Sequence, residues 1–183
     1  MTLPRGFKAR AEREAVRLRA DLGLRPQDAL DVDHLAGALD VAVVNAETLI
    51  DRHRLEELER LQAFSFSAAT FDIAGRSIIV TNPLRTPARR ASDVAHELAH
   101  ILLEHDLSEM RKIDGVAFRT CKPDEEEQAT TFGGTLMLPR PLLLRAAKAG
   151  LGPAEIAEHY GVTLEMARFR YNSTGVAKQA HNR

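Results

Sequence analysis

Apolar residues recur at two spacings along the 183-residue chain. A spacing of three and four gathers side chains on one face of an α-helix. It occurs in residues 8–22, 31–39, 94–103 and 124–137. Short apolar or alternating runs, typical of β-strands, occur at 41–44 and within 64–80. The mixture predicts an α+β fold in which a short antiparallel sheet packs on helices.

Capping residues indicate where these helices begin and end. Gly23 is expected to end the first helix, and either Asp31 or Asp33 begins the second, because both are good N-caps. Residues 51–61 set three leucines among charged side chains. This pattern suits either a helical turn or an exposed insertion, and the sequence does not decide between them.

The segment 64–80 has the pattern of a β-hairpin, with Ala74-Gly75 as its turn and Asn82-Pro83 after its second strand. Two interpretations of this hairpin are equally good. Its edge binds an extended peptide by backbone pairing, or the hairpin only covers the core. A helix then starts at Thr86-Pro87 or at Ser92-Asp93.

That helix carries the motif H-E-x-x-H in an apolar run. His96 and His100 lie ~40° apart around a helix and one turn apart along it, so both imidazoles can reach a single ion. Glu97 lies beside them, where it can touch a water on that ion. This is the arrangement of a zinc peptidase, with two His ligands and a Glu general base. The alternative is a core helix that carries two histidines by chance.

Composition narrows the class of protein. Hydrophobic residues make up 44% of the chain and charged residues 28%, as in an ordinary soluble globular protein. The formal net charge of −1 gives no global field that would recruit nucleic acid or an anionic membrane. Cys121 is the single cysteine, which excludes an internal disulfide and suits a reducing compartment. With no secretion signal and no membrane-length apolar run, we expect a cytoplasmic protein.

A catalytic zinc usually has a third protein ligand. His105 is five residues past His100 and Cys121 is a lone thiol, so both are weak candidates. The acidic start of the helix at 124–137 is a stronger source. Periodicity turns Glu127 away from the apolar stripe and leaves Glu125 and Glu126 equally placed.

Three blocks of this sequence resemble the ImmA/IrrE family of metallopeptidases. That family shows H-E-[LF]-[GA]-H-x-[LI]-L, then E-x-x-A-N-x-F-A, then L-L-M-P. This chain has HELAHILL at 96–103, EEQATTFG at 126–133 and LMLP at 136–139. The resemblance implies that Glu126, the first residue of the second block, is the third metal ligand.

Two positions depart from the family pattern. Thr130 replaces the Asn, and Gly133 replaces the Ala after Phe132. If the Asn supports a ligand through a hydrogen bond, Thr130 has to do so with its hydroxyl. This substitution bears on catalytic strength more than on metal binding.

Residues 153–172 have the spacing of a helix-turn-helix, with a turn at Gly161 and a cap at Thr163. The second helix carries Arg168 and Arg170, but Glu165 occupies the turn where base contacts would be made. We therefore expect a packing module and no direct DNA binding.

The polar aromatic residues nearest to a possible cleft are two tyrosines and a histidine of this segment. Either they face the cleft as oxyanion donors or they pack in the interior. They are His159, Tyr160 and Tyr171.

These observations combine into one expected architecture, a zincin-like metallopeptidase domain at 1–148 and a helix-turn-helix-like tail at 149–183. With zinc held by His96, His100 and Glu126, Glu97 takes a proton from the attacking water and passes it to the leaving amine. Two imidazoles and a carboxylate suit zinc, without excluding another divalent ion.

The resemblance implies an endopeptidase whose substrate is a regulatory protein, typically a helix-turn-helix repressor, so that cleavage relieves repression. Two rivals remain. One is a transcription regulator that uses 153–172 on DNA and has a structural metal site. The other is an interaction protein with a degenerate metal centre.

Overall fold

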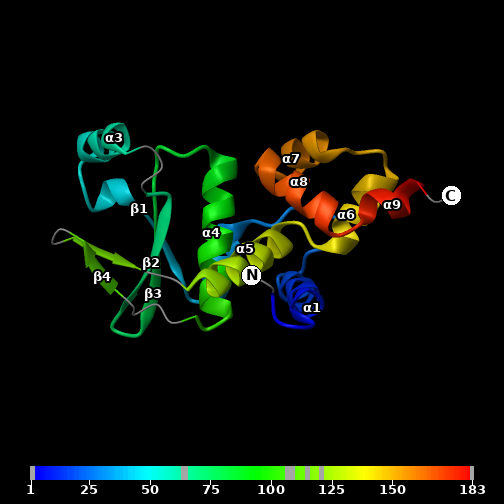
Figure 1. The fold of residues 1–183 in the computed structure, drawn as a ribbon, viewed down its shortest axis with the longest axis horizontal. Coiled ribbons are helices and arrows are strands. Elements are labelled where there is room, and N and C mark those ends of the chain that lie inside the picture. The colour runs from blue at the N-terminus through cyan, green and yellow to red at the C-terminus, as the bar shows by residue number, and fades with distance from the viewer. Residues whose placement is uncertain (1–2, 63–65, 106–109, 114–115, 120–121, 182–183) are drawn as a thin grey trace.

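The computed structural model describes residues 3–62, 66–105, 110–113, 116–119 and 122–181. Its elements in chain order are α1 (Phe7–Asp21), α2 (Val32–Ala38), β1 (Ala42–Asn45), η1 (Ala46–Thr48), α3 (Arg52–Leu61), β2 (Ala68–Ile73), β3 (Arg76–Thr81), α4 (Pro87–Leu102), β4 (Met110–Ile113), β5 (Val116–Arg119), α5 (Pro123–Met137), α6 (Arg140–Lys148), α7 (Pro153–Tyr160), α8 (Leu164–Ser173) and α9 (Val176–His181). The predicted α+β class is confirmed (Figure 1).

Local signals placed most boundaries correctly. The Asp31 side chain accepts hydrogen bonds from the backbone of residues 33 and 34, and Thr86 caps α4 with Pro87 in its first turn. The undecided segment at 51–61 is a helix, α3. Cys121, and the beginning of the predicted hairpin at 64–65, lie outside the described residues.

The main sheet has the order β1-β3-β2 and is mixed. Ala74 and Gly75 both have positive φ, 54° and 79°, and they form the predicted turn between antiparallel β2 and β3. The prediction of a wholly antiparallel sheet was wrong in one respect, since β1 pairs parallel to β3. A tight turn dictates how its own two strands pair, whereas the chain between β1 and β2 passes through α3 and leaves the direction of β1 to tertiary packing.

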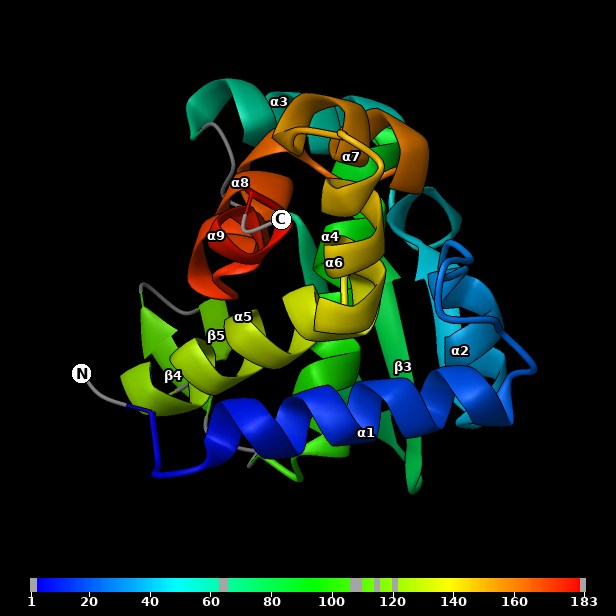
Figure 2. The same cartoon turned by 90° about the vertical axis from the view of Figure 1, so that its right-hand side faces the viewer.

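Helix α4 is central to the molecule. The main sheet lies on one side of it and α5 crosses it on the other, while α1 packs against α5 (Figures 1 and 2). Leu98, Phe132 and Leu136 belong to the single large apolar cluster that joins these layers. Burial of this cluster is the main favourable contribution to folding.

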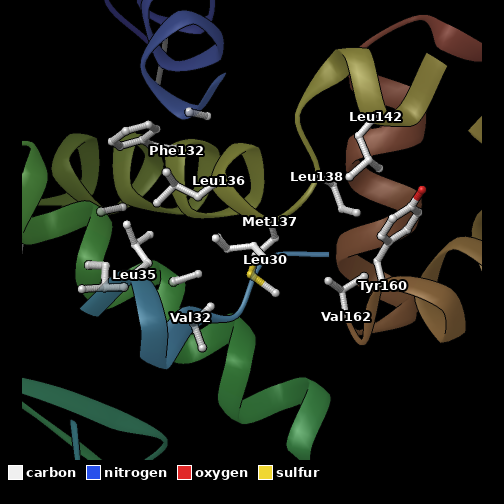
Figure 3. Close-up of a cluster of buried hydrophobic side chains, with 14 of the residues drawn as sticks. Leu30, Val32, Leu35, Phe132, Leu136, Met137, Leu138, Leu142, Tyr160 and Val162 are labelled. Carbon is white, nitrogen blue, oxygen red and sulfur yellow. The ribbon is translucent and has the colours of Figure 1, made fainter. Parts of the chain in front are cut away.

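The C-terminal helices share this cluster. Figure 3 shows Tyr160 and Val162 facing Leu138 and Leu142, and all four are buried. Ile156, in α7, is fully buried in the same cluster. Within the described part of the chain no helix has the length and apolar character needed to cross a bilayer.

Two buried arginines bind the carbonyl groups at the end of α5. The Arg19 Nη1 donates to the carbonyl of Leu136 at 3.1 Å, and the Arg170 Nε donates to that of Leu138 at 3.1 Å. The Arg170 Nη2 also forms an ion pair with Glu12, 2.6 Å away. Because the last carbonyls of a helix have no partner within the helix, α1 and α8 together complete the C-terminus of α5.

Helices α4 and α5 approach closely at Gly133. A Cβ atom placed there would lie 2.9 Å from the Ala95 carbonyl oxygen and 3.0 Å from the His96 Cα. The neighbouring atoms are backbone, so they cannot move away as a flexible side chain would. Gly133 is therefore a position at which the absence of a side chain lets the two helices come together.

We expect Gly133→Ala to lower the free energy of unfolding by about 1–3 kcal/mol, because the added methyl group forces the two backbones apart. Gly37→Ala is the matched control, since a Cβ at Gly37 in α2 meets nothing within 4 Å. The control should gain up to about 1 kcal/mol from helix propensity. Urea unfolding measures both, and equal values for the two variants would contradict the close approach.

Candidate metal centre

Helix α4 places two imidazoles one turn apart. The Nε2 atoms of His96 and His100 lie 3.0 Å apart. His100 is only 1% exposed, whereas His96 is half-buried and faces the cleft described below. The apolar neighbours of the motif, Val94 and Leu98, are fully buried and fix the helix against the core.

The carboxylate of Glu126 comes from the first turn of α5. Its oxygens lie 3.2 Å from the His96 Nε2 and 3.3 Å from the His100 Nε2. Glu125, the alternative that periodicity left open, contacts Lys122 instead at 3.3 Å. The structure therefore brings together the three side chains named from the sequence.

Their separations fit the size of a metal ion. One ligand atom from each of His96, His100 and Glu126 lies within 4.8 Å of the others. Ligand atoms about 2.05 Å from a tetrahedral zinc are separated by about 3.3 Å. The three contacts of 3.0–3.3 Å are close to that value. Two nitrogen donors and one oxygen donor can thus hold a divalent cation with little rearrangement.

Glu97 is held by a residue that the sequence analysis missed. Its side chain is 8% exposed, and the hydroxyl of buried Thr70 donates to the Glu97 Oε2 at 2.5 Å. Thr70 lies on β2, on the sheet face that packs against α4. The only available signal was a polar residue at a core-facing position of the strand before the motif, and no sequence rule pairs it with Glu97.

His105 also has a place in the centre. The sequence analysis weighed it as a ligand, but its Nδ1 lies 2.9 Å from the Nδ1 of His100. If His100 binds a metal through Nε2, its Nδ1 carries the proton and donates to His105. Such an outer contact fixes the tautomer and the ring orientation of a metal ligand.

A cleft of about 490 Å³ opens onto the centre. His96, Glu97 and Glu126 line it, and its walls come from β2, α4, α5 and α8. Thr130 is exposed in the α5 wall, one turn after Glu126. Its hydrogen bond to a ligand stays a prediction.

Asp93 lines this cleft with a side chain that is only 11% exposed. Burial raises the pKa of its carboxyl group, whereas the hydrogen bond from Arg89 acts in the opposite direction and lowers that pKa. The cleft wall beside the metal centre therefore contains an ion pair between Arg89 and Asp93.

The three tail aromatics are placed differently. Tyr160 is buried in the core, where burial raises the pKa of its phenol, and the ring of His159 lies edge-on to it. Tyr171 packs against the same core. None of the three lines the described cleft, so the packing interpretation holds for Tyr160 and Tyr171, whereas His159 is exposed.

A family model described as the IrrE N-terminal-like domain, Peptidase_M78, matches residues 48–172. The chain belongs to this family. The resemblance to ImmA/IrrE metallopeptidases is thereby confirmed, and the M78 match spans both metal-site helices and extends through most of α8. A search of curated proteins finds no match. The M78 assignment gives a peptidase of the metallopeptidase type, which acts on a protein substrate.

We expect His105→Ala to weaken zinc binding by about 10- to 100-fold, because the His100 ring loses the contact that orients it. Competition with a chromophoric chelator measures the affinity. His34→Ala, which removes an exposed histidine on α2, should have no effect. If the two variants bind zinc equally well, the contact between His105 and His100 does not support the centre.

Proposed function

We propose that the protein is a zinc-dependent endopeptidase of the cytoplasm that cleaves a regulatory protein. Residues 1–148 form its metallopeptidase domain and residues 149–183 a helical tail. One observation carries the proposal: His96, His100 and Glu126 converge beside Glu97 at the inner end of an open cleft, in a chain of the M78 family. Its donor set, two imidazoles and a carboxylate, is one that zinc favours.

His96, His100 and Glu126 would hold the zinc, which would supply a Lewis acid to acidify water and polarise a peptide carbonyl. Glu97 accepts a proton from the attacking water and delivers it to the amine that leaves when the C–N bond breaks. Thr70 holds one oxygen of that carboxylate.

An extended peptide segment fits the cleft as substrate. Strand β2 is at the edge of the main sheet, and its first residue, Ala68, lines the cleft together with His96. An edge strand offers backbone groups to an extended chain. This arrangement favours the peptide-binding interpretation of the hairpin over the covering one.

The identity of the substrate rests on the family resemblance, which points to a helix-turn-helix repressor. The contacts of the C-terminal helices argue against the alternative hypothesis of a DNA-binding regulator. Arg170, one of its two candidate base-contacting residues, is buried against Glu12 and the Leu138 carbonyl. Residues of α8 line the peptidase cleft, so that face of the helix is turned toward α4 rather than presented to a DNA groove.

We expect Glu97→Gln to bind one zinc per chain as tightly as the wild type, while peptide cleavage falls by at least about 100-fold. The assay incubates each protein with a helix-turn-helix repressor from the same organism and identifies fragments by mass spectrometry. Chelation should abolish cleavage by the wild type, and Glu127→Gln should leave it unchanged. Wild-type cleavage by the Glu97→Gln variant would exclude the proposed base.

Thr70→Val is expected to lower kcat by about 10- to 100-fold, because a hydrogen bond to a charged group contributes about 1.5–3 kcal/mol. The variant is nearly isosteric, so KM and zinc affinity should stay within about twofold of the wild type. Thr70→Ser, which keeps the hydroxyl, should recover most of the rate. An unchanged kcat in the valine variant would mean that Thr70 serves only packing.

A further inference from the structure

We propose that α8 determines which substrate side chain the cleft accepts, and that it selects a large apolar residue beside the scissile bond. The inference rests on the proposed peptidase function and adds a specificity-determining element to it. Its basis is the side chains that α8 contributes to the wall facing the metal centre.

Four residues from α8 and its N-cap line the cleft together with His96 and Glu126. They are Thr163, Glu165, Met166 and Phe169. Phe169 is 45% exposed, one of eight large apolar residues that are exposed in the described part of the chain. Burying it under a ligand is favourable, and an aromatic ring beside a thioether makes an adaptable apolar wall.

The position of this wall is fixed by the buried contacts that α8 makes with the core. Ala167 is fully buried, and Arg170 is held by Glu12 and the Leu138 carbonyl. Gly134 allows this close packing, since a Cβ there would lie 3.2 Å from the Arg170 side chain. Because α8 is fixed in rotation, Met166 and Phe169 face the cleft without a rearrangement.

Contacts across the cleft locate the apolar wall relative to the metal centre. Ser92 is on α4, one turn before His96. Its hydroxyl lies 3.9 Å from the Met166 sulfur. The neighbouring charged side chains of α4, Arg89 and Asp93, are paired with each other at 2.9 Å. A charge pair that is already satisfied gives little attraction to a charged substrate residue. Met166 and Phe169 supply the apolar side chains of this wall, which suit Leu, Ile, Met or Phe in the substrate.

The test separates binding from cleavage. Zinc-loaded Glu97→Gln protein, which should bind peptides without cutting them, is used to capture a random octapeptide library, and bound peptides are sequenced by mass spectrometry. We expect enrichment of Leu, Ile, Met or Phe at one position by about tenfold or more. Adding Phe169→Ala should abolish that enrichment, while zinc affinity stays unchanged.

Leu58→Ala is the matched control, since Leu58 is 44% exposed on α3 and is not in the cleft lining. It should keep the enrichment. Absence of apolar enrichment, or equal enrichment with and without Phe169, overturns the inference whatever the wild type cleaves. If the enrichment depends on Phe169 but wild-type protein cuts no captured peptide, the selectivity inference holds and the peptidase proposal fails.

Discussion

The distance between α4 and α5 is the constraint on which the candidate metal centre depends. The two imidazoles belong to α4 and the third donor, Glu126, to α5, so any separation of the helices moves the carboxylate from the rings. Gly133 follows Glu126 by seven residues, two helical turns along nearly the same face. The residue that allows the backbones to meet thus shares a face with the one that completes the donor set. The family pattern has Ala at this position, and the absence of a methyl group here permits a closer crossing.

Sequence reasoning succeeded where the information was local. Caps such as Asp31 and Thr86 act within three residues, and H-E-x-x-H needs only the helical repeat to bring its imidazoles together. It stopped at the third ligand, because Glu125 and Glu126 were equally placed about the apolar stripe of their own helix. The family resemblance pointed to Glu126. Which of the two carboxylates reaches the imidazole rings depends on where α4 crosses α5, and this is a tertiary contact that the periodicity of one helix does not contain.

The contacts that sequence reasoning missed join distant or unpatterned positions. Thr70 and Glu97 are 27 residues apart, and a threonine in a strand carries no signal that it will donate to a carboxylate. His105 was judged by ligand spacing, whereas its contact with His100 uses the ring nitrogen on the far side from Glu126. The sequence also did not predict the parallel pairing of β1 with β3, because no turn connects these two strands.

The ion pair between Glu12 and Arg170 joins positions 158 residues apart. Contacts of such long range form late, since the intervening chain must first be ordered. During synthesis α4 and α5 leave the ribosome well before α8, so both histidines and Glu126 precede the last wall of the cleft. A nascent chain can therefore contain the proposed metal ligands and base while the α8 surface beside them is still unmade, so the selectivity proposed for α8 would be acquired last.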